Sequence, residues 1–127
     1  MTRIARCCCQ ACRIEVEGEP TMNAVCNCAS CKRRTGSAFG WSVYFRNEDI
    51  RERRGDLTVY LVAGPPEGRR WFCSRCGTTL SWDGGDQTGF AGGCFVDTPL
   101  PEPNITSHYD RRFAWVALPD GWMRISH

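Results

Sequence analysis

The 127-residue chain lacks the features that would place it in a membrane or among disordered proteins. Its apolar runs are interrupted within a few residues, well short of the roughly 20 that a membrane span needs. Internal repeats, low-complexity segments and long polar linkers are also missing. A composition of 42% hydrophobic and 24% charged residues is typical of a globular protein. We therefore expect one domain over residues 1–127, with no membrane partner.

An excess of charge of one sign is also lacking. Sixteen basic and 14 acidic residues leave a formal net charge of +2, too balanced to predict nucleic-acid binding from electrostatics alone. Local basic clusters do occur, at 51–54 and at 32–34. Such runs are most often solvated faces, and we predict no nucleic-acid partner.

The first residues lack the apolar stretch of a secretory signal, because charged residues follow soon after Cys7-Cys8-Cys9-Gln10. We therefore expect a cytoplasmic protein. A reducing compartment keeps thiols free, so clustered cysteines there favour metal binding over disulfides.

Sustained helical periodicity is absent as well; only 29–35 and 47–50 suggest a helical turn. The rest of the chain contains short stretches rich in aromatic and β-branched residues, separated by Gly, Pro, Asp or Asn, which is typical of strands. The predicted strands are 13–17, 39–45, 57–62, 70–73, 78–82, 90–96 and 113–118. This pattern predicts an all-β fold with short helical turns.

What the chain does have is cysteine. Ten of the 127 residues are cysteine, at the edge of the range that signals a disulfide or metal scaffold. They stand at positions 7, 8, 9 and 12, at 26, 28 and 31, at 73 and 76, and at 94. Cys73 and Cys76 form a Cys-x-x-Cys turn that can hold zinc, and Gly77 supplies unusual backbone angles. Cys7 and Cys9 point to the same side of an extended chain and make a second plausible half-site.

The middle cluster offers three thiolates, Cys26, Cys28 and Cys31. A zinc ion with three protein ligands keeps a position open for water or substrate. Spacing alone leaves the pairing open, since 28/31 could equally join 73/76 in a zinc ribbon. It also leaves open whether the second site is closed by a further ligand, for which the candidates are Cys8, Cys12, Cys94 and His108.

Three cysteine blocks, 7–16, 26–39 and 72–78, together with 115–121, closely resemble the glutathione-dependent formaldehyde-activating (GFA) family, to which centromere protein V is related. The resemblance implies a β-tent domain with two zinc ions per chain. The structural zinc would be held by Cys7, Cys9, Cys73 and Cys76. The second, catalytic zinc would be held by Cys26, Cys28 and Cys31, and we expect this site to be only partly occupied by zinc.

Four residues depart from the family pattern. The family usually has Gly at the position of Gln10, an aliphatic residue at Cys12 and His at Asn27, and a His is common near Asn104. The first two changes concern packing. The other two remove imidazoles that could shuttle protons or contact substrate.

The resemblance implies a carbon–sulfur lyase-type reaction, the condensation of formaldehyde with glutathione to S-hydroxymethylglutathione. The partners would be a small thiol such as glutathione and an aldehyde. We expect Lys32 and Arg33, directly after Cys31, to offset the thiolate charge or bind glutathione carboxylates. The alternatives are a different thiol or aldehyde, or a non-catalytic zinc-stabilised binding module, because a fold does not fix a function.

Overall fold

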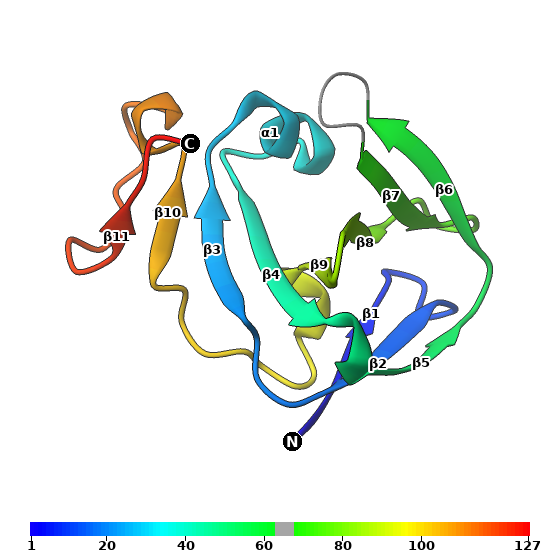
Figure 1. Cartoon of the computed structure of the whole chain (residues 1–127). Helices are drawn as coiled ribbons and strands as arrows, with labels where there is room; N and C mark the ends of the chain where they lie inside the picture. Colours follow the sequence, from blue (N-terminus) through cyan, green and yellow to red (C-terminus); the bar gives the residue numbers. More distant parts are fainter. Residues whose placement is uncertain (63–67) are drawn as a thin grey trace.

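The computed structural model describes residues 1–62 and 68–127, and in them the chain is mostly β. A three-stranded sheet has the order β1-β2-β5, formed by Thr2–Arg6, Arg13–Glu17 and Ile50–Arg54. An eight-stranded sheet has the order β11-β10-β3-β4-β9-β8-β7-β6 and curves around the molecule (Figure 1). Its strands, in chain order, are β3 Met22–Cys26, β4 Gly40–Arg46, β6 Leu57–Val62, β7 Gly68–Cys73, β8 Thr79–Gly84, β9 Gln87–Ala91, β10 Ile105–Ser107 and β11 Met123–Arg124.

Short helical segments connect the strands. The helix α1 spans Ala29–Thr35, and three 3-10 turns, η1 Asn47–Asp49, η2 Gly92–Phe95 and η3 Tyr109–Arg111, follow β4, β9 and β10. The prediction of helical turns near 29–35 and 47–50 is confirmed. Among the described residues, no helix has the length and apolar character that crossing a bilayer requires.

The core lies where the two sheets meet. In β2, Ile14 and Val16 are fully buried while their charged neighbours are partly exposed, as the period-two pattern predicts. Three aromatic rings form the centre, with Phe45 and Phe95 both packed against Phe90 at centroid distances of 5.7 and 5.5 Å. Edge-to-face contacts of this kind contribute about 0.5–1.5 kcal/mol each beyond area burial.

Two predicted strands are wrong in whole or in part. Strand β9 ends at Ala91, and Gly92–Phe95 is a 3-10 turn. The Trp41 ring lies so close to Gly92 that a Cβ there would be 2.2 Å from it. The segment 113–118 is a loop. Its backbone folds into a turn in which the Val116 amide donates to the Phe113 carbonyl at 2.9 Å.

Strand β3 positions the candidate site. It pairs antiparallel with β4 and parallel with β10, so that Cys26 lies opposite Gly40 on one side and Ser107 on the other. The chain then enters α1, which lies over this end of β3 and β4 (Figure 1). The helix ends at Gly36, whose φ of 63° is the left-handed conformation that glycine favours.

Candidate metal centres

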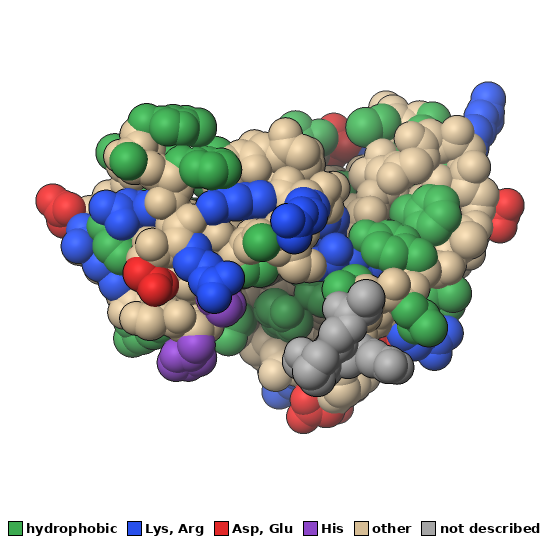
Figure 2. Space-filling model, turned by 90° about the horizontal axis from the view of Figure 1, so that it is seen from above, with side chains coloured by type: hydrophobic (Ala, Val, Ile, Leu, Met, Phe, Trp, Pro, Cys, Tyr) green, Lys and Arg blue, Asp and Glu red, His purple; other side chains and the backbone are tan. Residues whose placement is uncertain are grey.

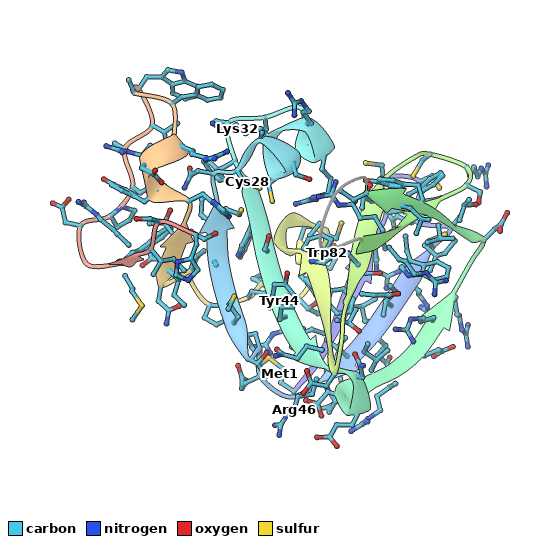
Figure 3. The ribbon with its side chains drawn as sticks, turned by 45° about the horizontal axis from the view of Figure 1, so that its top comes forward. Met1, Cys28, Lys32, Tyr44, Arg46 and Trp82 are labelled. Atoms are coloured by element: carbon cyan, nitrogen blue, oxygen red, sulfur yellow. The ribbon has the colours of Figure 1, made fainter. Side chains whose placement is uncertain are left out.

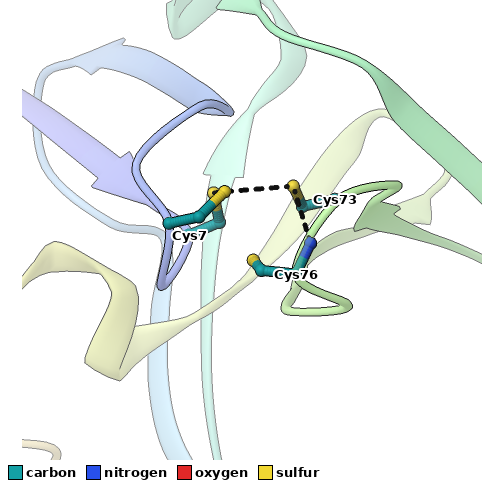
Figure 4. A group of neighbouring side chains, drawn as sticks. Cys7, Cys73 and Cys76 are labelled. Carbon is teal, nitrogen blue, oxygen red and sulfur yellow. Dashed lines mark hydrogen bonds between the residues drawn. The ribbon is translucent and has the colours of Figure 1, made fainter.

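The first cysteine cluster joins two hairpins. The sulfur atoms of Cys7, Cys9, Cys73 and Cys76 all lie within 4.8 Å of one another (Figure 4). The Cys7–Cys9 and Cys9–Cys73 sulfur distances are 3.6 and 3.7 Å. A tetrahedral zinc ion with bonds of about 2.3 Å places its sulfur ligands about 3.8 Å apart. The donor set and its spacing therefore fit zinc.

The hairpins that carry these cysteines belong to different sheets. Cys7 and Cys9 lie in the turn between β1 and β2, whereas Cys73 ends β7 and Cys76 lies in the turn before β8. Thr78 ties the two turns together, because its hydroxyl accepts a hydrogen bond from the Cys8 amide at 3.1 Å and contacts the Cys76 sulfur at 3.2 Å. A bound metal would thus link the two sheets.

Backbone amides donate hydrogen bonds to two of the four sulfurs of this cluster. The Arg75 and Cys76 amides donate to the Cys73 sulfur at 3.4 and 3.5 Å, and the Cys12 amide donates to the Cys7 sulfur at 3.2 Å. The Cys76 amide bond and then the Arg75 bond lower the pKa of Cys73, and a hydrogen bond from Thr78 lowers the pKa of Cys76 to about 5. Such bonds stabilise the charged form that binds metal.

The second cluster lies at the end of β3. The sulfurs of Cys26 and Cys28 and a ring nitrogen of His108 all lie within 4.8 Å of one another. Cys28 is the N-cap of α1, and its sulfur accepts a hydrogen bond from the Cys31 amide at 3.3 Å. A hydrogen bond from the Cys31 side chain lowers the pKa of Cys26 to about 5, and the same contact raises the pKa of Cys31 well above its usual range. The predicted trio is therefore brought together only in part: Cys26 and Cys28 group with His108, whereas the Cys31 sulfur, which interacts with Cys26, lies outside that group.

The two basic residues predicted to contact substrate point elsewhere. The Lys32 amine donates to the Arg111 carbonyl at 2.5 Å and lies 3.9 Å from the centre of the Phe113 ring. Figure 3 labels Lys32 together with Cys28, the residue at which α1 begins. Arg33 is exposed and has no hydrogen bond or ion pair within 1–62 and 68–127. Figure 2 shows many basic side chains gathered on this end of the molecule.

Arg34, the third residue of the same basic run, lies beside Cys31. Its guanidinium lies 4.5 Å from the Trp82 ring centre, and its Nη2 is buried without a hydrogen-bond partner in the described part of the chain. Because a Cβ on Gly40 would lie 2.8 Å from Arg34 Nη2 and 3.0 Å from Cys31 Cβ, this cation lies beside Cys31. The signal in the sequence was the spacing of three from Cys31, which puts both residues on one face of a helical turn.

A cavity of about 650 Å³ lies beside the first cluster, where Cys7, Gly77 and Thr78 line it. Arg34 and Trp41 also line it, but the cysteines of the second cluster and His108 do not. The buried and unpaired Nη2 of Arg34 makes this cavity suited to an anionic group.

The remaining cysteines lie outside both clusters. Cys8 is exposed, Cys12 is fully buried and Cys94 is half-buried. Burial raises the pKa of Cys12 to about 12 and that of Cys94 to about 11, so both are neutral thiols near neutral pH. Cys12 therefore belongs to the core, as the sequence suggested.

Comparison with known proteins gives a likeness in fold and a family match. A crystal structure of a Rhodobacter sphaeroides protein superposes with a TM-score of 0.58 at 22% identity, covering 96% of this chain and 98% of that one; this likeness concerns the fold alone. No curated protein matches the chain. The family model described as glutathione-dependent formaldehyde-activating enzyme matches residues 2–110. The chain therefore belongs to the glutathione-dependent formaldehyde-activating (GFA) family.

Proposed function

We propose that the protein is a zinc-dependent enzyme that joins a small thiol, such as glutathione, to formaldehyde or a related aldehyde, and that also runs the reverse lyase reaction. The observation that carries the proposal is the cluster of Cys26, Cys28 and His108, with Cys31 next to Cys26. Arg34, which lines a cavity, lies beside Cys31. Membership of the GFA family supports the same substrates.

The reaction needs a thiolate close to an aldehyde carbon. The thiol gives up its proton, its sulfur bonds to the carbonyl carbon, and the carbonyl oxygen takes up a proton to become the hydroxyl of the adduct. A zinc ion held by the three cysteines would supply an ionised substrate sulfur at neutral pH. We assign to this chain the tasks of holding that ion and orienting the thiol.

Arg34 is the residue that we expect to orient the substrate. Glutathione carries carboxylates, and a guanidinium with a free buried N–H binds a carboxylate strongly. Arg34 supplies such a group beside Cys31. Arg33 is exposed and Lys32 is engaged with Arg111, so neither is in a comparable position.

The first cluster has a structural role in this proposal. Four protein sulfurs would leave its zinc closed to substrate, so we expect two zinc ions per chain with different tasks. We also place the protein in the cytoplasm, since a reducing compartment preserves ten free thiols.

The proposal is tested by following ¹³C-formaldehyde and glutathione by exchange NMR with fully zinc-loaded protein. We expect the protein to speed adduct formation, and the Arg34→Gln variant to bind glutathione about tenfold or more weakly. Arg33→Gln is the matched control and should behave as the wild type. If protein carrying two zinc ions leaves the spontaneous rate unchanged, the chain is a zinc-stabilised binding module instead.

A further inference from the structure

We propose that His108 is the fourth protein ligand of the second zinc, so that the resting site holds three sulfurs and one nitrogen. An incoming thiol would replace the imidazole as a thiolate, with its proton passing to the released imidazole, an exchange that rests on the function proposed above. The ligand assignment itself rests on geometry, because a His108 ring nitrogen lies within 4.8 Å of the sulfurs of Cys26 and Cys28.

The backbone of His108 is held in an unusual conformation that serves this placement. Its φ of 48° and ψ of 43° are left-handed, which costs a non-glycine residue about 1–2 kcal/mol. Within the described residues only Gln10 is a further non-glycine residue with positive φ. Such strain persists where the surroundings hold it and clusters at functional sites.

Strand β10 delivers His108 to the cysteines. Ser107 lies opposite Cys26 in the parallel pairing of β10 with β3, so the next residue leaves the sheet beside the cluster. The fully buried Asn27 holds this strand in place, because its amide Nδ2 donates to the Thr106 hydroxyl at 2.8 Å and to the Ser107 carbonyl at 3.0 Å.

The other side of His108 is held as well. Lys32, on α1, donates to the carbonyl of Arg111 at the end of η3. The segment that carries the imidazole is therefore attached both to β3 and to the helix that follows Cys28. Asn27, which stands where the family usually has His, thus positions a histidine from a distant part of the chain.

Ligand chemistry explains why the imidazole is the group that leaves. Three thiolates and a neutral imidazole around Zn²⁺ carry a net charge of −1, and this donor set is common in zinc sites. Exchange for a substrate thiolate would make the net charge −2 while the three cysteines remain as ligands. Arg34, beside Cys31, lies where it can offset that added charge.

The test is ¹¹³Cd NMR of the metal-exchanged protein with ¹⁵N-labelled histidine. The chain has two histidines, His108 and His127, so His127→Gln leaves a single ring to observe. We expect one cadmium resonance with sulfur ligands only and a second that couples to the His108 ring nitrogen. Absence of this coupling in protein carrying two cadmium ions would overturn the ligand assignment.

A variant separates a ligand from a structural residue. His108→Gly relieves the left-handed strain, so a merely structural role predicts equal or higher stability with unchanged metal binding. We expect zinc at the second site to become at least about tenfold easier to remove with a chelator, while the first site is unaffected. Unchanged retention would count against the ligand role.

Added glutathione distinguishes failure of this inference from failure of the proposed function. If the coupling to His108 is present and glutathione abolishes it, both hold. If glutathione leaves it in place, His108 is a ligand of a closed site and the thiol reaction is wrong. If the coupling is absent yet glutathione shifts the second resonance, the function stands and the ligand assignment is wrong.

Discussion

The three basic residues that follow Cys31 make different contacts. Lys32 fastens α1 to η3, Arg33 faces solvent, and Arg34 lies over Trp82 beside the sulfur cluster. The sequence shows only three consecutive cations. Which of them faces the cavity depends on where the seven-residue helix begins and ends, a boundary that spacing does not define to one residue.

Removal of the Lys32 amine tests its fastening role. We expect Lys32→Met to lower the free energy of unfolding by about 1–2 kcal/mol, because a charged hydrogen bond and a contact with an aromatic face are lost. The measurement is chemical denaturation of the zinc-loaded protein. Arg33→Met, the adjacent control, should change it by less than about 0.5 kcal/mol; equal losses in the two variants would contradict this role.

Thiol reactivity of the metal-free protein tests the electrostatics. A pKa lowered to about 5 leaves Cys76 ionised at neutral pH, whereas a pKa raised to about 11 leaves Cys94 protonated. We expect alkylation of Cys76 to be nearly constant between about pH 6 and pH 8, and alkylation of Cys94 to rise about tenfold per unit. Mass-spectrometric mapping of singly labelled protein measures both, and faster labelling of Cys94 near pH 6 would refute the assignment.

At the scale of elements, two hairpin turns supply the candidate ligands of the first cluster, and the second draws on the end of β3, the start of α1 and His108 after β10. Cys7 and Cys9 come from the β1–β2 turn, and Cys73 and Cys76 from the β7–β8 turn. Tight packing around these turns sets the ligand spacing. Gly55, after β5, approaches the first of them so closely that a Cβ would lie 2.4 Å from the Ala11 carbonyl oxygen.

Substitution of this glycine tests that close approach. We expect Gly55→Ala to destabilise the protein by about 2–4 kcal/mol, since a left-handed φ of 96° and a backbone clash act together. Gly85→Ala is the control, because its φ of 76° carries similar strain but no atom lies within 4 Å of the added Cβ. Thermal or chemical unfolding measures both, and the idea fails if the two losses are equal.

Sequence patterns predicted β2 from its alternation but missed β1, Thr2–Arg6, although burial alternates there too. Residues 13–17 alternate regularly and form β2. Strand β3 was missed because Met22–Cys26 has neither alternation nor a run of β-branched residues; its three central residues are all buried between neighbouring strands. The aromatic segment 113–118 lacks a strand partner and folds into a turn.

At the scale of the whole molecule, the first cluster connects the two sheets. A zinc ion there would close a long loop through the core, and binding energy of a structural zinc contributes directly to folding. Seven thiolates on two zinc ions would also change the formal charge from +2 to −1, since the sites add +4 − 7 = −3. The loaded protein is thus slightly acidic.

Loss of one ligand tests this connection. We expect Cys9→Ser to lower the zinc content from two ions per chain to one and to destabilise the protein by several kcal/mol. Cys8→Ser changes the adjacent cysteine, which lies outside the cluster, and should leave zinc content and Tm unaltered. Metal analysis and thermal unfolding measure both effects; a Cys9→Ser protein that keeps two zinc ions would contradict the assignment.

The sequence predicted those parts of the candidate site whose cysteines are close together along the chain. Cys73 and Cys76 are a local turn, and Cys26, Cys28 and Cys31 are close neighbours in the chain. His108 was one of four candidates for a further ligand, because its place beside Cys26 depends on the parallel pairing of β10 with β3. That pairing joins distant segments and leaves no local pattern.

The same parallel pairing bears on the order in which the protein is made. A ribosome releases the chain from its first residue onward, and segments fold as they emerge. All four ligands of the first cluster precede Cys94, whereas His108 and the strand that carries it come later. A zinc ion at the first cluster would therefore be able to bind while synthesis continues, whereas the second site with the proposed His108 ligand would be completed only after β10 has emerged.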